Sequence, residues 1–367
     1  MAAAGCSLKR CGLEEKTVFL LESKKIRSSY DVLRLTPIDL VQLLDVPLAA
    51  ARDIIRTVSS RLARKAERTT ALHMKEAELK DPRSVKTGFE TLDKALKGGL
   101  RAGTVTELVG PPGSCKSQFC IQVALFATLP RNLGGLDGKV LYFDAENHFR
   151  AERLVQMAQA RFPERYLTLP LLKKLLRRVL VAPLPTLSHL ESLLPNLEKA
   201  ILEHDVRGIV IDNIALLAKT EYPPAETVKR QGVLGEVASH LKRVACAYRI
   251  PVVIVNQATS VREGSYGANG SDIGVMRVKA RQGMDDCSAA LGPKWAHYIN
   301  TRISLVYKGA EGAGVLNLVK SPFAPEMTLA FTSAKGGLYE VGDEFDGRAV
   351  EGRGAELERH RGVLQYL

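Results

Sequence analysis

The first 64 residues place their apolar side chains at helical spacing. The pattern predicts helices over residues 13–21, 29–35, 37–44 and 48–62. Thr36 followed by Pro37 is a favourable helix start, because proline suits the first helical position. The sequence therefore predicts a small all-α domain over residues 1–64.

The last two of these helices are joined by a tight turn within LLDVPLAAARDII, residues 43–55. Two helices joined in this way resemble a helix-hairpin-helix, a module whose backbone amides can contact DNA phosphates. Asp45 stands where that turn usually has glycine, and its carboxylate would repel a phosphate. The domain is therefore either a DNA-contacting hairpin or a helical interaction domain, and Asp45 favours the second.

A change of pattern separates this domain from the rest of the chain. Residues 65–84 are rich in Lys, Arg and Glu without a clear apolar face, which predicts a solvated linker that is partly helical. From residue 87 onward, predicted strands at 104–109, 139–144, 179–182, 207–212 and 251–256 alternate with predicted helices at 116–128, 151–162, 187–204 and 230–247. Continuous apolar runs such as GIVID and VVIVN are typical of buried parallel strands. The alternation predicts an α/β core, a mostly parallel sheet with helices on both faces.

Beyond Gly292 the pattern holds strands without helices. They fall at residues 301–307, 314–319 and 327–331, and we expect them to add antiparallel to one edge of the sheet. The core is thus expected over residues 85–340. Residues 341–367, rich in Gly, Arg and Glu, are expected to form a disordered tail.

Charge and composition narrow the class of protein. The net charge of +12 and pI near 9.4 favour a polyanionic partner such as nucleic acid. No stretch approaches the roughly 20 apolar residues of a membrane helix, so no membrane partner is expected. The six cysteines include no Cys-x-x-Cys pair, which disfavours structural zinc and a disulfide scaffold.

The segment TELVGPPGSCKSQFC, residues 106–120, carries the most informative chemistry. It reads as a strand, a Gly-rich loop and a helix that begins near Lys116, an arrangement in which backbone amides can bind phosphate oxygens. Lys116 would reach the β- and γ-phosphates of ATP, and the Ser117 hydroxyl would coordinate Mg²⁺. The candidate nucleotide-binding residues are Gly110, Pro111, Pro112, Gly113, Ser114, Cys115, Lys116 and Ser117.

This loop departs from the pattern G-x-x-x-x-G-K-[ST] at one position. Cys115 replaces the second glycine and puts a sulfur where the backbone approaches the phosphate. Such a change could reduce ATP affinity or turnover without abolishing either. The alternative is a Gly/Pro turn before a helix that binds no nucleotide.

Three polar residues at the ends of other predicted strands complete a candidate site. Asp212 ends GIVID and, on a strand neighbouring that of the loop, could hold Mg²⁺. Glu146 follows VLYFD and could act as the general base toward the attacking water. Gln257 follows VVIVN and could sense the γ-phosphate. Each could instead be a capping or strand-end residue, but ligands bind at this edge of an open sheet.

Several motifs resemble those of the RecA-like recombinase family, over roughly residues 84–331. KTGFETLDKALKGGL and GTVTELVGPPG are similar to the entry to its core, and LYFDAENHFRAERL is similar to its eukaryotic branch. LGPKWAHYINTR and GGLDGKVLYFDAE look most like the B branch of the eukaryotic paralogues. The resemblance implies a RecA-like P-loop NTPase core behind a helix-hairpin-helix-like domain. Asn213 stands where this family commonly has serine.

The resemblance also implies a function. Members are DNA-dependent ATPases that use ATP and Mg²⁺ in homologous recombination, in the nucleus, at double-strand breaks and stalled forks. The paralogues bind single-stranded and branched DNA, associate with one another in hetero-oligomers, and assist loading of the main recombinase. Cys115 predicts weak hydrolysis here, which leaves open an ATP-bound scaffold that scarcely hydrolyses. No convincing Phe-x-x-Ala polymerisation motif lies in the linker, which disfavours the other alternative, a filament-forming recombinase.

Two segments are expected to face DNA in this architecture. One is residues 219–230, and the other is residues 258–290, a Gly-rich stretch without strand or helix periodicity. Long loops of that kind are usually functional, and spaced cations suit a groove along a phosphate backbone. The alternative is a solvated loop. The candidate DNA-binding residues are Lys229, Arg230, Arg262, Arg277, Lys279 and Arg281.

Overall fold

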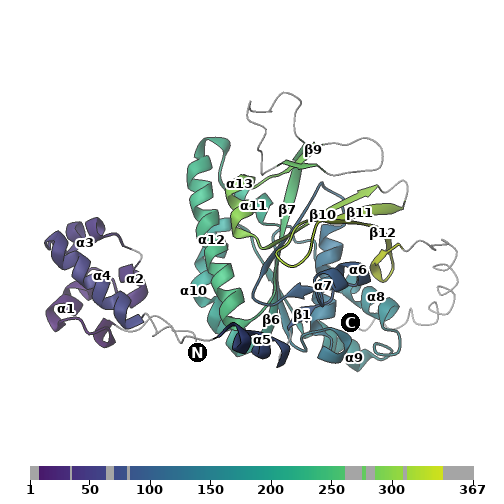
Figure 1. The fold of residues 1–367 in the computed structure, drawn as a ribbon, viewed down its shortest axis with the longest axis horizontal. Coiled ribbons are helices and arrows are strands. Elements are labelled where there is room, and N and C mark those ends of the chain that lie inside the picture. The colour runs from purple at the N-terminus through teal and green to yellow at the C-terminus, as the bar shows by residue number, and fades with distance from the viewer. Residues whose placement is uncertain are drawn as a thin grey trace. The chain divides into compact units, whose positions relative to one another are not determined.

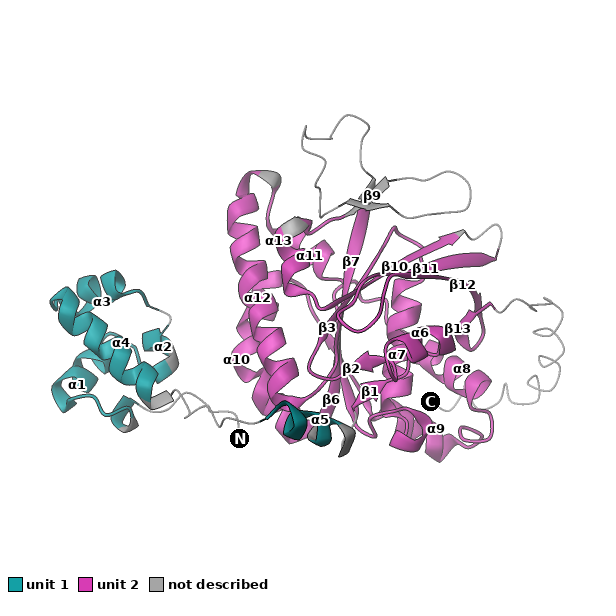
Figure 2. Ribbon diagram, in the orientation of Figure 1, with its two compact units in different colours: residues 1–82 teal, residues 83–367 magenta. Residues whose placement is uncertain are grey.

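The computed structural model divides the chain into two compact units, residues 1–82 and 83–367 (Figure 2). The structure describes residues 8–33, 35–62, 70–80, 83–260, 275–277, 286–308 and 312–341. Apart from Val341, the predicted C-terminal tail lies outside the described residues. The predicted domain limits at residues 64, 85 and 340 stay predictions.

The first unit is all-helical. Its elements are η1 (Leu8–Arg10), α1 (Glu15–Ser23), α2 (Ser29–Leu33), α3 (Pro37–Leu44), α4 (Leu48–Leu62) and α5 (Ala71–Lys80). The four predicted helices are confirmed, and α5 occupies half of the segment predicted as a linker. A small core holds η1 to α4 together, and in it Leu21, Val32, Leu40 and Val58 are fully buried.

The turn between α3 and α4 shows why glycine is usual there. Asp45 ends α3 in the left-handed conformation, with φ 53° and ψ 48°. Glycine adopts that conformation without a Cβ penalty, and aspartate is among the few other residues that tolerate it. At the other end of α3, Thr36 and Asp39 form a reciprocal capping box that fixes where the helix begins.

The second unit is built on one large sheet, and its first two strands form a separate two-stranded sheet. Its strands are β1 (Ser84–Val85), β2 (Leu100–Arg101), β3 (Val105–Gly110), β4 (Lys139–Asp144), β5 (Val179–Pro183), β6 (Val206–Asp212), β7 (Val252–Ser260), β8 (Val275–Arg277), β9 (Asp286–Ala289), β10 (Thr301–Lys308), β11 (Ala313–Lys320), β12 (Met327–Ala334) and β13 (Gly337–Glu340). Its helices are α6 (Glu90–Ala95), α7 (Lys116–Thr128), α8 (Ala151–Arg161), α9 (Leu169–Leu176), α10 (Leu187–His204), α11 (Ile214–Glu221), α12 (Thr227–Tyr248) and α13 (Gly292–Tyr298), with the 3₁₀ turns η2 (Arg131–Leu133) and η3 (Pro224–Glu226).

The main path of the large sheet runs in the order β13-β12-β11-β10-β3-β7-β6-β4-β5. The expected parallel core is confirmed, since β3 through β7 pair in parallel. The antiparallel additions begin one strand later than expected. β10 itself is parallel to β3, whereas β11, β12 and β13 each pair antiparallel with the strand before them.

Helices cover both faces of the sheet, and each face has its own core. Figure 1 shows α7 and α8 on one side and α10 and α12 on the other. The alternation along β7 divides its side chains, because Val253 and Val255 pack with α7 whereas Val252 and Ile254 pack with α12. Strands buried on both faces read as continuous apolar runs for this reason.

Two local expectations were wrong. Helix α13 lies in the region predicted to hold strands alone. Gly292 and Pro293 at its start weaken the helical pattern, so the sequence did not predict this short helix. Residues 258–290 are not structureless throughout, because β7 extends to Ser260 and pairs with β9, which also pairs with β8. Residues 219–229, for which no secondary structure was predicted, are largely helical, since they hold the end of α11, η3 and the start of α12. No helix among the residues described is long and apolar enough to cross a membrane.

A buried polar cluster ties α13 and β10 to β3. The side chain of Glu107, on β3, is fully buried and accepts hydrogen bonds from Asn256 Nδ2 at 2.7 Å and Trp295 Nε1 at 2.8 Å. Its other carboxylate oxygen lies 2.5 Å from Nε of Arg302, which is also buried. Buried charges need such partners. Glu107 therefore joins β7, α13 and β10 to the strand that leads into the Gly-rich loop.

Candidate nucleotide site

The Gly-rich loop connects β3 to α7 and requires glycine at two places. A Cβ at Gly110 would collide with the carbonyl oxygen of Leu305 and with Oγ of Ser114. Gly113 has φ +77°, a conformation that favours glycine. The loop then delivers Lys116 and Ser117 into the first turn of α7, whose free amides can bind an anion.

Cys115 has a backbone conformation that explains the glycine of the usual pattern. Its φ is 66° and its ψ 19°, the left-handed region, immediately before α7. The left-handed conformation costs a residue with a Cβ about 1 kcal/mol or more. The thiol is half-buried and hydrogen-bonded with Ser333 of β12, and burial raises its pKa. Cys115 is therefore a neutral thiol in a strained position.

The ammonium group of Lys116 lies against the loop. Its Nζ donates to the carbonyl oxygens of Gly110 at 2.9 Å and Pro111 at 2.7 Å, and to Ser114 Oγ at 3.3 Å. Burial lowers the pKa of Lys116, and the charges of Asp212 and Glu146 act in the opposite direction. The lysine is thus near both candidate carboxylates.

The order of strands sets the order of polar groups along the carboxyl edge of the sheet. Asp212 was expected on the strand next to β3, which leads into the loop. It lies one strand further away, because β7 lies between β3 and β6. Gln257 is in register with Gly110, and Asp212 is in register with Asp144. The edge therefore presents the loop, Gln257, Asp212 and Glu146 in that order, where open α/β sheets bind ligands.

Asp212 is almost fully buried and fits a magnesium ligand. Burial raises the pKa of its carboxyl group, and hydrogen bonds from Ser117 and Tyr142 lower it. The Tyr142 hydroxyl donates to it at 2.8 Å. The charges of Glu146 and Asp144 raise the pKa of Asp212 further. The Asp212 carboxylate and the Ser117 hydroxyl that contacts it are oxygen groups, and Mg²⁺ prefers oxygen ligands.

No group of three or more His, Cys, Asp and Glu side chains that could hold a metal ion occurs in the described part of the chain. Mg²⁺ beside a nucleotide is commonly held by one or two protein oxygens together with phosphates and water.

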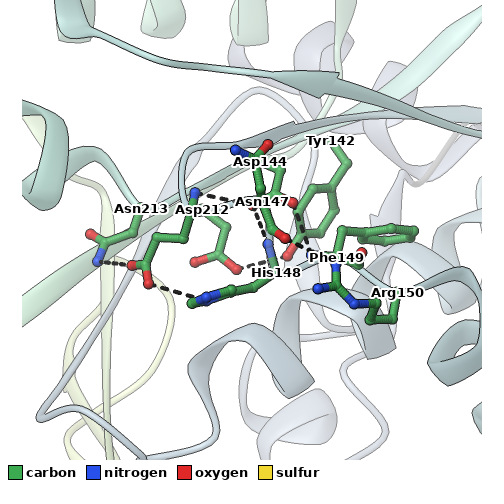
Figure 3. A network of polar contacts seen from close by, with 9 residues as sticks. Tyr142, Asp144, Asn147, His148, Phe149, Arg150, Asp212 and Asn213 are labelled. Carbon is green, nitrogen blue, oxygen red and sulfur yellow. Dashed lines mark hydrogen bonds and ion pairs between the residues drawn. The ribbon is translucent and has the colours of Figure 1, made fainter.

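Figure 3 shows a network of polar contacts around Asp144, His148 and Asn213, and Glu146 belongs to it through its contacts with His148 and Asn213. Asn213 Nδ2 donates to its Oε1 at 3.0 Å, and Nδ1 of His148 lies 3.3 Å from its Oε2. The backbone amides of Glu146, His148 and Phe149 donate to Asp144 at 2.8–3.3 Å. Asp144 therefore closes the turn before α8, and the Glu146 side chain points toward Asn213 and His148.

Gln257 is half-buried at the end of the parallel part of β7. Its Oε1 accepts a hydrogen bond from Lys219 Nζ at 3.3 Å. Lys219 lies on α11, the helix that follows Asp212 and Asn213. The sequence did not indicate this contact, nor those of Tyr142, Asp144 and Asn213. For Asp144 a signal existed, because it ends its strand as Asp212 does.

The candidate DNA-binding residues are only partly described. Lys229 pairs with Glu226 at 3.4 Å and lies 5.5 Å from the ring of Tyr222, whereas Arg230 has a buried Nε without a hydrogen-bond partner. Arg277 lies on β8, opposite Asp286. The predictions for the other three residues lie outside the described residues, namely Arg262, Lys279 and Arg281.

Comparison with known proteins identifies the family. The Rad51 family model matches residues 80–341, and the model of the XRCC3/RpoA-like helix-hairpin-helix domain matches residues 8–62. The mouse "DNA repair protein RAD51 homolog 2" is 33% identical over 92% of this chain and 98% of its own length. The protein of the same name from Arabidopsis thaliana is 32% identical over 96% of this chain and 94% of its own length. The predicted RecA-like family is confirmed, and this chain belongs to the Rad51 family.

Proposed function

We propose that this chain is an ATP-binding accessory protein of DNA repair by homologous recombination. The observation that carries the proposal is the convergence of the loop with Gln257, Asp212 and Glu146 at one sheet edge. Lys116 would bind the β- and γ-phosphates of ATP, and Ser117 with Asp212 would hold Mg²⁺. The names of the relatives support a role in DNA repair.

Each residue of the proposed site would have a separate role in the hydrolysis of ATP. Mg²⁺, when bound, would neutralise charge on the β- and γ-phosphates. Glu146 would accept a proton from the attacking water, and Gln257 would hydrogen-bond the γ-phosphate. Lys116 would stabilise the charge that develops on the leaving phosphate. We propose weak, DNA-dependent ATPase activity on this basis.

We further propose single-stranded and branched DNA, other paralogues and the main recombinase as partners, and the nucleus as the location. The net charge of +12 and the "DNA repair" names of the relatives support the DNA proposal. The proposed working units are the helical domain of residues 1–64 and the ATPase core of residues 85–340. Loading of the main recombinase would then be the accessory role.

The test is ATP turnover by the purified chain with and without single-stranded DNA, together with equilibrium ATP binding. ATP binding with DNA-stimulated turnover would support the proposed function. Binding without turnover would favour an ATP-bound scaffold, the alternative that the strained Cys115 supports. Strand exchange by this chain alone would favour a filament-forming recombinase instead. If ATP does not bind, the proposal is wrong for the isolated chain.

Replacing Cys115 with glycine is expected to raise ATP turnover by about fivefold. Glycine removes the side chain from the place where the backbone approaches the phosphate, and about 1 kcal/mol of improved transition-state stabilisation corresponds to that factor in rate. Steady-state kinetics at saturating ATP measures the effect. Cys115→Ala is the matched control, because it removes the sulfur but keeps the Cβ and should turn over like the wild type. Unchanged turnover in Cys115→Gly would show that this position does not limit the reaction.

Replacing Arg277, Lys279 and Arg281 together with alanine is expected to weaken single-strand binding. Three fewer phosphate contacts would reduce the slope of log affinity against log salt by about 2. Fluorescence anisotropy over a salt series measures both quantities. The triple change of Lys173, Lys174 and Arg177, exposed on or beside α9, is the control that removes the same charge elsewhere. Equal salt slopes in both triple variants would contradict the assignment.

A further inference from the structure

Both ends of the Asn213 side-chain amide are engaged. Asn213 is only 1% exposed and directly follows Asp212 at the start of α11. Its Oδ1 accepts the backbone amide of Ala215 at 3.1 Å and so caps α11. Its Nδ2 donates to Glu146 Oε1 at 3.0 Å (Figure 3). The cap therefore fixes the orientation of the amide that faces Glu146.

We infer that Asn213 is a positioning residue that holds the Glu146 carboxylate in the orientation needed to accept a proton from water. This inference rests on the proposed ATPase function, in which Glu146 is the base. An ionised carboxylate has about four acceptor sites on its two oxygens, so the Asn213 contact leaves sites for a water molecule. Asn213 acts through Glu146 and needs no contact with the nucleotide.

His148 contributes less to holding Glu146. Its side chain is 68% exposed, so water competes for the contact between Nδ1 and Glu146 Oε2. The Asn213 contact is at the buried end of the network, where a hydrogen bond is stronger than in water. The rigid donor is therefore Asn213, on an amide that the first turn of α11 immobilises.

Two substitutions separate this positioning role from the capping of α11 by Asn213. Asn213→Asp keeps an oxygen that can cap α11, but it replaces the donor to Glu146 with a charged acceptor. Asn213→Ala loses the cap and the donor but adds no charge beside Asp212. Loss of the hydrogen bond to Glu146 is the change that the two variants share. Measuring both at saturating Mg²⁺ removes any effect of the added charge on metal binding.

Both variants are expected to lower kcat for ATP by about tenfold to a hundredfold, because small misplacements of a reacting group cost that much. The dissociation constant of ATP should stay within about twofold of the wild-type value. In a Glu146→Gln background, neither substitution should reduce kcat further. Unchanged kcat in either variant, a loss accounted for by weaker ATP binding, or a further tenfold loss in the Glu146→Gln background would overturn the inference.

A second measurement needs no turnover. Crystal structures of the nucleotide-free wild type and of Asn213→Ala should show one Glu146 conformation in the wild type and a shifted or multiple conformation in the variant, with α11 intact. The same single Glu146 conformation in both would overturn the inference. This comparison still decides the role of Asn213 if the wild type fails to bind ATP, a result that refutes the proposed function alone.

Discussion

Replacing Lys116 with alanine is expected to reduce ATP affinity at least about a hundredfold. The ammonium group lies in the loop between its carbonyl oxygens and would bridge two phosphates through charge-assisted hydrogen bonds. Loss of about 3 kcal/mol in binding corresponds to that factor. Equilibrium binding of a fluorescent ATP analogue measures it, and turnover should fall below detection.

The control for this substitution is Lys94→Ala. Lys94 carries the same charge on α6, but its side chain is 79% exposed and pairs with Glu90 at the surface. Exposed pairs of this kind contribute little. ATP affinity should be unchanged in Lys94→Ala, and thermal unfolding of both variants should show that each is folded. Retained ATP affinity in a folded Lys116→Ala protein would refute the assignment of the loop.

Replacing Arg302 with leucine is expected to lower the free energy of unfolding by about 3–5 kcal/mol. Glu107 would then be a fully buried carboxylate without its cationic partner, and breaking a buried pair has that cost. The loss is a large part of the roughly 5–15 kcal/mol that stabilises a typical domain. Urea unfolding followed by fluorescence measures it, and Trp295, the single tryptophan of the chain, touches Glu107 directly.

The matched control changes both members of the pair. In Glu107→Gln combined with Arg302→Leu, the buried charge is gone, and the glutamine oxygen can still accept hydrogen bonds from Asn256 and Trp295. Most of the lost stability should return, because removing both charges of a buried pair is often nearly neutral. A cost below about 1 kcal/mol for Arg302→Leu alone would contradict the burial of this pair.

Much of the core was predictable because its elements are long and periodic. The sequence patterns of α7, β4 and α10 predicted their bounds to the residue, since helical and strand periodicities differ clearly over such lengths. Short elements were missed. In α13 a glycine and a proline interrupt the periodic signal, and its identity as a helix depends on packing such as that of the fully buried Trp295.

The candidate site was predicted as a set of residues but not as an arrangement. Strand-end positions indicated Glu146, Asp212 and Gln257, because a parallel sheet brings its carboxyl ends to one edge. Strand order is a property of the folded sheet, so the sequence did not show that β7 lies between β3 and β6. The roles of the three residues remain predictions.

The fold class, the Gly-rich loop and the identity of the polar strand ends could be predicted from the sequence, because these depend on local periodicity and spacing. Which side chains contact one another depends on the tertiary structure. Asn213, which the sequence indicated only as a mild departure from a common serine, contacts Glu146 from 67 positions further along the chain. Contacts of that kind depend on strand order and helix capping together, and the neighbouring residues in the sequence do not predict this combination.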